Sequence, residues 1–273
     1  MKILFIGVFT EGSTNNSQRD SLKGLGHDVE EFSYRSENNF NVKLQEKKDY
    51  DVVLIAKGNG ISEYTMKQLK KNNKKIIYWF MDPAQTFTSE MAMKTYYSDK
   101  SFFDKPKTLE LAKKYNDESY YVCEGYDESV DVVQNVKKQY DISFIGNVYG
   151  NRSSVLDRLE NVNIISSAYG LQHSIEVGKT KINLNICTDN CASDRIYKVL
   201  AAGGFLLTDD WHGRELTGLV DGEDLVIYKD VEDLQEKIEF YLSRSYTRDK
   251  IASRGLSKVT NLTRTEWANA ILR

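Results

Sequence analysis

The sequence predicts an α/β protein with two lobes, each built around a parallel β-sheet. Apolar strand-like runs alternate with helical stretches along most of the chain, which is the pattern of strand–helix–strand units. The pattern restarts at Tyr140, where a new strand leads into a glycine turn. The 273 residues also suit two domains of roughly 130 residues each. In such lobes we expect ligands at the carboxyl ends of the strands, in a cleft that both lobes face.

The first predicted domain covers residues 1–139. It opens with a strand over Lys2–Val8, a polar loop over Thr10–Ser17 and a helix that ends at Gly26. The later segments with a clear pattern are strands over Val29–Tyr34, Asp51–Ala56, Lys75–Phe80 and Ser119–Glu124 and a helix over Ser62–Asn72, with Ser62 as its N-cap. Residues 84–115 show a weaker helical pattern, and the sequence leaves the order of their elements open.

The second predicted domain covers residues 140–260 and repeats the alternation. Its expected strands are Asp141–Ile145, Val162–Ser166, Ile182–Ile186, Phe205–Thr208 and Asp224–Tyr228, and its expected helices are Asn151–Leu159, Ser193–Ala202, Val231–Leu242 and Thr247–Val259. The remaining segment, 261–273, contains a last helix over Arg264–Leu272. This helix is a candidate for packing back on the N-terminal domain.

Composition and missing motifs exclude several classes of function. The net charge of −3 provides no general attraction to nucleic acid or anionic lipid. No apolar run reaches the length of a membrane span, so we expect a cytoplasmic protein. The chain lacks the GxGxxG, GxxxxGK[ST], GxSxG and HExxH patterns, which argues against a dinucleotide-binding dehydrogenase, a P-loop enzyme, a serine hydrolase and a zinc protease. The three cysteines have no companion His cluster, and we expect no metal site.

The segment Lys179–Asp209 carries the clearest chemical signal. An apolar strand runs into a polar loop, Ser193 and Asp194 can cap the next helix, and Gly203-Gly204 ends that helix before a buried strand. A loop that feeds a helix N-terminus offers backbone N–H groups and the positive end of the helix dipole, which together bind an anion such as a diphosphate. The alternative is an ordinary strand–helix–strand crossover with a well-capped helix.

The segments SDRIYKVLAAGGFLLTDD and DGEDLVIYKDVEDLQEKIEFYLS resemble the C-terminal lobe of GT-B glycosyltransferases, in particular the family 1/family 4-like group that includes spore-maturation-type proteins. DISFIGNVYGNR is similar to the first strand and phosphate loop of that lobe, and ILFIG, LGHDVEEFSY, DVVLIAKG and IIYWFMDP are similar to pieces of the N-terminal lobe. The resemblance implies two Rossmann-like domains that face a cleft, with a nucleoside-diphosphate sugar bound by the second domain and an acceptor by the first. It also implies a glycosyltransferase that needs neither a metal ion nor a cofactor.

Position by position, the resemblance implies that a set of residues in the second lobe binds the donor nucleotide sugar. Gly146 and Asn147 fall at the turn that contacts the phosphates, and Arg152 falls at the basic diphosphate clamp. The other assigned positions are Lys181 in the strand ahead of the donor loop, Ser193, Asp194 and Arg195 at the start of the donor-binding helix, and Lys198.

One departure from the family concerns the two glutamates of its Glu-x7-Glu motif. These positions are occupied here by Asn190 and Lys198. A carboxylate accepts hydrogen bonds from ribose hydroxyls, whereas an ammonium only donates. The sequence therefore favours a role for Lys198 beside the diphosphate, and it leaves a plain surface lysine as the alternative.

The predicted catalytic carboxylates lie in the first lobe. Glu11 belongs to the loop after the first strand, and Asp82 follows a strand and precedes Pro83. Either one is a candidate acid or base, and a solvated loop charge and a turn residue are the respective alternatives. His173 and His212 are assigned to loops of the second lobe, and His212 is a candidate contact for the donor sugar. The aromatic residues Tyr96, Tyr97, Phe102 and Phe103 form either a stacking platform or a small core.

Three classes of function remain open at this stage. The first is a glycosyltransferase whose acceptor is a glycan, a small molecule, a protein or modified DNA. The second is a noncatalytic GT-B-like protein that binds a nucleotide sugar, which the two missing glutamates favour. The third is a phage-type DNA glycosyltransferase that acts on modified bases, against which the net charge argues.

Overall fold

The structure, a computed structural model, describes residues 1–273 and divides into two compact units. The N-terminal unit contains Met1–Glu124 and Arg264–Arg273, and the C-terminal unit contains Gly125–Thr263. The first boundary between the units therefore lies between Glu124 and Gly125, earlier in the sequence than the predicted boundary between residues 139 and 140. Residues 125–139 join the second unit because Ser174 Oγ donates a hydrogen bond to the Val130 carbonyl at 2.9 Å and Lys138 Nζ donates to the Thr180 carbonyl at 2.7 Å.

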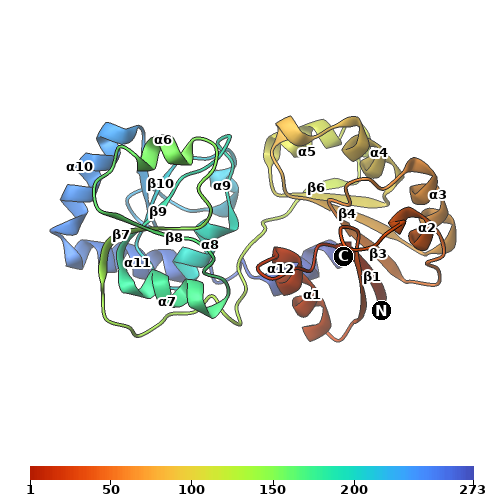
Figure 1. Ribbon diagram of the computed structural model, residues 1–273, viewed down its shortest axis with the longest axis horizontal. Coiled ribbons are helices and arrows are strands. Elements are labelled where there is room, and N and C mark those ends of the chain that lie inside the picture. Colours follow the sequence, from red (N-terminus) through yellow and green to blue (C-terminus); the bar gives the residue numbers. More distant parts are fainter. The chain divides into compact units, whose positions relative to one another are not determined.

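The N-terminal unit is built on a six-stranded, fully parallel sheet (Figure 1). The strand order is β2-β1-β3-β4-β5-β6, so the order reverses between β1 and β3. The strands are β1 (Lys2–Gly7), β2 (Asp28–Ser33), β3 (Val52–Ala56), β4 (Ile76–Phe80), β5 (Lys100–Phe103) and β6 (Ser119–Tyr121). Every residue of β3 and β4 is buried, which explains their continuous apolar sequences.

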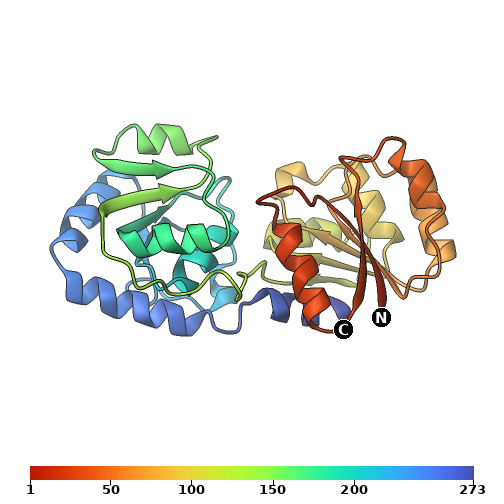
Figure 2. The same ribbon diagram turned by 60° about the horizontal axis from the view of Figure 1, so that its bottom comes forward.

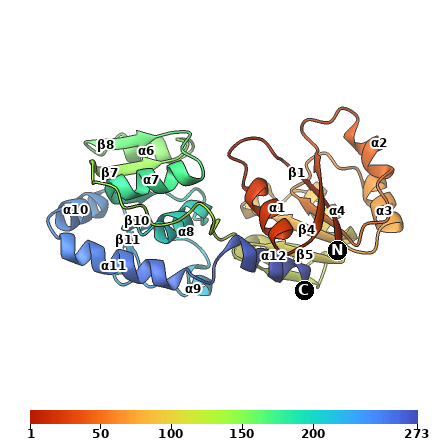
Figure 3. The same cartoon turned by 90° about the horizontal axis from the view of Figure 1, so that it is seen from below.

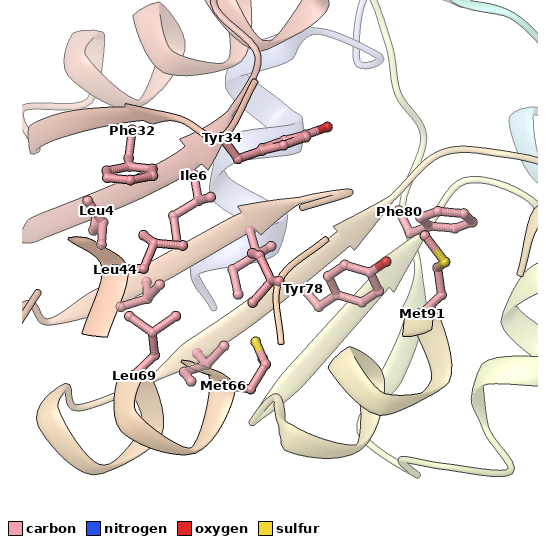
Figure 4. Packing of buried hydrophobic residues seen from close by; sticks show 14 of the residues in the cluster. Leu4, Ile6, Phe32, Tyr34, Leu44, Met66, Leu69, Tyr78, Phe80 and Met91 are labelled. Atoms are coloured by element: carbon pink, nitrogen blue, oxygen red, sulfur yellow. The ribbon is translucent and has the colours of Figure 1, made fainter. Parts of the chain in front are cut away.

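Helices cover both faces of this sheet. They are α1 (Thr14–Gly24), α2 (Phe40–Gln45), α3 (Glu63–Asn72), α4 (Ser89–Tyr97), α5 (Pro106–Ala112) and α12 (Arg264–Leu272), with a short 3₁₀ turn, η1 (Ala84–Thr86). Leu44, Met66, Leu69 and Met91 from α2, α3 and α4 pack on one face with strand residues such as Tyr78 (Figure 4). The N-cap of α3 is Ser62, as predicted, and its hydroxyl accepts from the Thr65 N–H at 3.2 Å.

Helix α12 covers the other face of the N-terminal sheet together with α1. Trp267, Ala268 and Ile271 of α12 are buried against strand residues, and the Trp267 ring meets Trp79 edge to face with centroids 5.7 Å apart. Figure 2 shows α12, in blue, beside α1, in red, although the two helices lie at opposite ends of the sequence. The last ten residues are therefore part of the N-terminal core.

The C-terminal unit has a five-stranded parallel sheet with the order β11-β10-β9-β7-β8. The strands are β7 (Tyr140–Ile145), β8 (Val162–Ile165), β9 (Thr180–Asn185), β10 (Leu206–Asp209) and β11 (Val226–Tyr228). The helices are α6 (Arg152–Leu156), α7 (Leu171–Lys179), α8 (Asp194–Ala201), α9 (Arg214–Thr217), α10 (Val231–Leu242) and α11 (Ser245–Lys258). The order of strands reverses between β7 and β9, and in open parallel sheets such a switch point is where ligands bind.

The chain passes between the two units twice, and these two crossings lie side by side although they are more than a hundred residues apart in the sequence. The N–H of Tyr126 donates to the Leu262 carbonyl at 3.0 Å, and Tyr126 forms a parallel bridge with Thr263. Gly125 has a positive φ of 69°, and a Cβ atom there would come within 2.3 Å of the Leu262 carbonyl oxygen, so this crossing requires glycine. No helix of the structure combines the length and the apolar character that crossing a bilayer requires.

Candidate donor and acceptor sites

The switch point of the C-terminal sheet brings together two loops that the sequence assigned to the donor. One loop follows β7 and begins at Gly146, and the other follows β9 and ends at Ser193. Arg195, after the second loop, joins the two strand ends through hydrogen bonds to the Ile145 carbonyl of β7 and to Asn185 of β9. The sheet topology thus places the predicted phosphate loop and the predicted donor helix next to each other.

Arg195 is the centre of this cluster. Its side chain is buried, its Nε donates to the Ile145 carbonyl at 2.6 Å, and its Nη1 donates to Asn185 Oδ1 at 2.9 Å. The guanidinium also lies over the Phe144 ring, 4.5 Å from the centroid. Burial, and then the positive charge of Arg152, lower the pKa of Arg195 to about 10, so the residue remains a cation at neutral pH.

Arg152 lies in the same cluster, but it holds protein backbone. Its Nε donates to the Ile186 carbonyl at 3.1 Å, its Nη1 donates to the Asn147 carbonyl at 2.9 Å, and only 2% of the residue is exposed. The guanidinium stacks on the Tyr149 ring at 4.2 Å from the centroid. Arg152 therefore ties the loop after β7 to the end of β9, whereas the sequence interpretation expected a clamp directed at phosphate.

The N-terminus of α8 is not closed by a side chain. Ser193 is the N-cap residue, but its hydroxyl donates to Asn185 Oδ1 at 3.2 Å instead of accepting from a backbone N–H of the helix. Asp194 and Lys198 form an ion pair of 2.7 Å one turn apart on α8. The carboxylate of this pair draws the Lys198 ammonium toward the helix itself, which differs from the expectation of a lysine directed at the diphosphate.

Two polar residues at this edge, buried Asn185 and half-buried Asp209, form hydrogen bonds that the sequence did not predict. Asn185 accepts from Arg195 and Ser193, and its amide donates to Thr208 Oγ1 at 2.9 Å. Asp209, at the end of β10, accepts from the Cys187 N–H at 2.8 Å, and burial raises the pKa of its carboxyl. Asn185 has no distinctive sequence signal, because β9 already contains the polar residues Thr180, Lys181 and Asn183.

A cavity of about 600 Å³ opens beyond these residues, at the carboxyl ends of β10 and β11. Its lining includes carboxylates, one arginine and an aromatic ring: Asn190, Asp209, Asp210, Arg214, Asp221 and Tyr228. Arg214 Nε donates to Asp210 at 2.8 Å and so compensates one of the carboxylates. The His212 side chain is exposed. Its backbone N–H donates to the Asn190 carbonyl at 3.0 Å, which anchors the loop next to this cavity.

Lys181 lies away from the candidate donor site. It is the second residue of β9, and its Nζ pairs with Asp141 at 2.6 Å, near the start of the neighbouring β7. Because β7 and β9 are parallel, this pair occupies the amino edge of the sheet, whereas Gly146 and Ser193 follow the carboxyl edge. The structure therefore does not bring Lys181 together with the other predicted donor residues.

In the N-terminal unit, both predicted catalytic carboxylates follow the carboxyl ends of strands. Glu11 is exposed in the loop between β1 and α1. Asp82 follows β4, and its Oδ1 accepts from Lys57 Nζ at 2.6 Å, where Lys57 follows the adjacent β3. The loop that carries Lys57 is itself fixed, because buried Lys94 of α4 donates to the Lys57 and Gly58 carbonyls at 2.7 and 2.8 Å.

Asp104 is a further carboxylate at this edge that the sequence analysis missed. It follows β5, pairs with Lys105, and keeps its second carboxyl oxygen, Oδ1, buried without a hydrogen bond. Burial, opposed by Lys105 and reinforced by Glu124 and Asp82, raises its pKa from 3.8 to about 7. A carboxyl of this kind exchanges a proton near neutral pH, which is a frequent property of functional sites.

The aromatic residues between positions 96 and 103 lie in two different environments. Phe102 and Phe103 belong to β5 and lie in the sheet cores, which matches the core interpretation. Tyr96 is 63% exposed and lines a shallow hollow of about 330 Å³ with Tyr97 and Tyr115. His173, expected in a loop, lies instead in α7 and is buried.

The sequence model of the glycosyl transferase-like family matches residues 129–272, more than half of the chain. A comparison with curated proteins gives no match. Among solved structures, HepE from Anabaena in complex with UDP and glucose is similar, with a TM-score of 0.73, 10% identity, and coverage of 100% of this chain and 98% of HepE. Sucrose-phosphate synthase from Thermosynechococcus elongatus gives a TM-score of 0.71 at 10% identity, with 100% and 97% of the two chains covered.

A glycosyltransferase from Rickettsia africae is also similar, with a TM-score of 0.68 and 12% identity over 99% of this chain and 96% of that one. These similarities extend over both units and confirm the predicted GT-B fold, with its two all-parallel sheets. The family match confirms the predicted class of enzyme. The chain is a glycosyltransferase and belongs to the glycosyl transferase-like family.

Proposed function

We propose that the enzyme transfers a sugar from a nucleoside-diphosphate sugar, whose diphosphate binds between the loop after β7 and the N-terminus of α8. The observation that carries this proposal is the pair of buried guanidinium groups of Arg152 and Arg195. Their hydrogen-bond partners are backbone carbonyls and the Asn185 amide, with no carboxylate among them. Two buried cations of this kind are compensated best by an anion that enters from outside the chain.

The open N-terminus of α8 adds to this positive site. The helix dipole and the backbone N–H groups near Ser193 favour a phosphate there, and Asn147 is exposed at the facing loop. In this proposal Arg195 contacts the diphosphate, Arg152 holds the loop that carries Asn147 in place, and Asp194 positions Lys198 at the rim. Guanidinium groups and a helix N-terminus can stabilise the charge on a leaving diphosphate, so the proposed reaction requires neither a metal ion nor a cofactor.

The reaction has a simple balance. The acceptor oxygen forms a bond to the anomeric carbon of the sugar, the bond from that carbon to the diphosphate breaks, and the acceptor hydroxyl loses its proton. We propose Asp82 as the first candidate to receive this proton, because its ion pair with Lys57 holds it at the end of a buried strand, and Glu11 as the second. The residues described above give no specific support to the DNA-modifying or the noncatalytic alternative.

Binding calorimetry with UDP tests the donor proposal. UDP is the first nucleotide to try because the structurally similar HepE was crystallised with UDP and with UDP-glucose. Replacing Arg195 by Met should weaken UDP binding by about 1.5–3 kcal/mol, which is roughly tenfold to a hundredfold in Kd. Arg195→Lys keeps the charge but loses the fork of donors, and should give an intermediate loss.

The matched control is Arg158→Met, which removes an exposed arginine paired with Glu232 in the same unit. It should leave UDP affinity unchanged. Thermal melting of each variant verifies that the unit remains folded. Unaltered UDP affinity in folded Arg195→Met and Arg195→Lys would show that the donor diphosphate binds elsewhere.

A further inference from the structure

Lys94 of α4 is a lysine whose side chain is completely buried. It is 0% exposed, whereas lysine side chains are almost never fully buried unless they are paired. Burial lowers the pKa of Lys94, and the Glu90 carboxylate opposes this effect. An apolar side chain would pack on the sheet without removing a charge from water, as Met91 of the same helix does (Figure 4). The buried charge therefore indicates a role that packing alone does not require.

The ammonium of Lys94 binds the loop between β3 and α3. Its Nζ donates to the Lys57 carbonyl at 2.7 Å, to the Gly58 carbonyl at 2.8 Å and to Glu90 Oε1 at 2.7 Å, so each of its three N–H donors has an acceptor. The same Glu90 oxygen accepts from the Gly60 N–H at 2.7 Å. Helix α4 lies against β4 and beside α3, as Figures 1 and 3 show. Two residues one turn apart on α4 thus hold three backbone groups of this loop.

These bonds maintain a backbone conformation that is unusual for lysine. Lys57 has a φ of 58°, in the left-handed region that residues with a side chain rarely adopt. Such outliers persist only where the surrounding structure maintains them, and they are frequent at functional sites. The Lys57 carbonyl and the next one along the chain both face the buried ammonium. Lys94 is therefore a group that keeps Lys57 in this conformation.

Lys57 is also the residue that contacts the proposed base. Its Nζ donates to Asp82 Oδ1 at 2.6 Å, and its backbone N–H donates to the Trp79 carbonyl of β4 at 2.9 Å. The Asp82 carbonyl accepts from Thr108 Oγ1 of α5 at 3.1 Å. The two side chains of the ion pair are 31% and 33% exposed, and so open a pair fixes its own geometry only weakly. The order of this pair therefore comes from the backbone on either side of it.

We infer that Lys94 is a positioning residue for the reaction. Through the loop of residues 57–60 it determines where the Lys57 ammonium lies, and that ammonium holds Asp82 where it receives the proton that the acceptor hydroxyl loses. Lys94 itself does not touch the substrate, because its side chain is closed off from solvent. This inference rests on the proposed function, which assigns Asp82 as the base. Lys94 then affects turnover only through Asp82 and leaves donor binding in the C-terminal unit unchanged.

Hydrolysis of a nucleotide sugar by the full chain tests the inference. UDP-glucose is the first probe, and GDP-, ADP-, CDP- and dTDP-glucose follow. Replacing Lys94 by Met keeps a long side chain and removes the ammonium. Because a small displacement of a catalytic group is costly, kcat should decrease by about tenfold to a hundredfold, with KM for the nucleotide sugar unchanged. Lys57→Met should have a similar effect, since it removes the group on which Lys94 acts.

The same substitution in an Asp82→Asn background separates positioning from a general effect on the fold. Once the carboxylate is an amide, Lys94→Met has no base left to displace. The double variant should therefore be as slow as Asp82→Asn alone, whereas two independent effects would multiply. A lysine that only stabilises the unit would reduce the rate by the same factor in both backgrounds.

Lys237→Met is the matched control. Lys237 of α10 also pairs with an acidic residue one turn earlier, Asp233 at 2.6 Å, and also donates to a backbone carbonyl, that of Ile227 at 2.7 Å. This variant should melt at a lower temperature than the wild type and keep its kcat. Lys94→Gln retains an N–H donor for the loop, and it replaces Lys94→Met in both backgrounds if the Met variant does not fold.

A loss of kcat that disappears in the Asp82→Asn background supports the inference. Unchanged kcat in the folded Lys94 variant, or an equal loss in both backgrounds, overturns it and leaves the assignments of the donor site and of the base standing. Full activity of Asp82→Asn removes the base and this inference, while the donor site remains. Failure of the wild type to hydrolyse any of the five nucleotide sugars removes the proposed function and the inference with it.

Discussion

The Nη2 atom of Arg195 lies 2.2 Å from the point at which a Cβ atom on Gly146 would sit. Gly146 also has a φ of 143°, a conformation that residues with a side chain rarely adopt. Its N–H donates to the Ile165 carbonyl at 2.8 Å, so the turn cannot easily move away from the arginine. The absence of a side chain at Gly146 therefore determines where the guanidinium of Arg195 lies.

The first prediction is that Gly146→Ala weakens UDP binding by about tenfold, because the new methyl group displaces Arg195 from the proposed diphosphate site. Calorimetry with UDP measures this loss. Gly222→Ala is the matched control, since Gly222 also has a positive φ, 73°, but has no atom within 4 Å of the added Cβ. Both variants should melt at a lower temperature than the wild type, and only Gly146→Ala should lose affinity. Equal affinities in the two variants would contradict the prediction.

The second prediction concerns the ion pair of Asp194 and Lys198. Lys198→Glu places a second carboxylate one turn beyond Asp194 on α8, and the two negative charges oppose an incoming diphosphate. We expect Lys198→Glu to reduce UDP affinity far more than Lys198→Ala does, because Lys198 itself is engaged by Asp194. A family-like ribose carboxylate at this position would instead increase affinity.

Lys237→Glu on α10 is the control for this charge reversal. Lys237 pairs with Asp233 at 2.6 Å with the same spacing of four residues and a similar exposure. It should destabilise its helix to a comparable extent without changing UDP binding. A comparable loss of affinity in both variants would point to the net charge of the unit instead of the donor site.

The third prediction distinguishes the two candidate bases of the N-terminal unit. Asp82→Asn should lower kcat/KM for hydrolysis of the nucleotide sugar that the enzyme accepts, with UDP-glucose as the first probe, by about 10²–10⁴-fold, the usual contribution of a general base. UDP binding should not change, because Asp82 belongs to the unit without the proposed donor site. Glu11→Gln, which changes an exposed loop residue, should have a much smaller effect. The reverse order of the two variants would identify Glu11 as the base.

The fourth prediction is a dependence of stability on pH that comes from Asp104. Its folded-state pKa of about 7 is above the ordinary value of 3.8, so the folded chain binds the proton more tightly than the unfolded chain does. The contribution of Asp104 to stability is therefore greatest at low pH and decreases as the pH rises through this window. Asp82, Glu124 and Lys105 are the charged groups that act on this carboxyl.

Replacing Asp104 by Asn should remove this dependence. Urea unfolding of both proteins gives the difference in their free energies of unfolding at about pH 4 and about pH 8. The Asn variant should gain stability relative to the wild type as the pH rises between these values. A difference that stays constant over this range would show that Asp104 titrates normally.

The elements that the sequence predicted well are those with strong local signals. The apolar run of Val52–Ala56 and the helices Val231–Leu242 and Arg264–Leu272 are found with nearly or fully the predicted bounds. Helix α7 was missed because Gly170 and Gly178 bracket a segment with no N-cap side chain, which has the local character of a loop. The domain boundary was placed too late because residues 125–139 have no regular pattern and join their unit only through distant contacts.

Only part of the candidate site could be predicted, because only some of its residues have a clear local signal in the sequence. Arg195 was found from its place at the start of a helix, but its two partners, Ile145 and Asn185, lie 50 and 10 residues away and meet it only in the folded sheet. The burial of Arg152 and the ion pair of Lys181 likewise depend on which strand is the neighbour. Asp104 was overlooked because the dipeptide Asp104-Lys105 has the composition of a solvated turn, and only the tertiary structure buries it.

The place of α12 in the N-terminal core has a consequence for how the protein is made. The C-terminal unit is a continuous segment inserted into the N-terminal one, so a ribosome synthesises all of Gly125–Thr263 before it adds the helix that covers Ile3, Phe5 and Trp79. The C-terminal unit can thus complete its core first. The N-terminal unit keeps one face of its sheet uncovered until α12 has been synthesised. During that interval its apolar surface is open to chaperones, and a fragment of residues 1–124 alone would keep that surface permanently exposed.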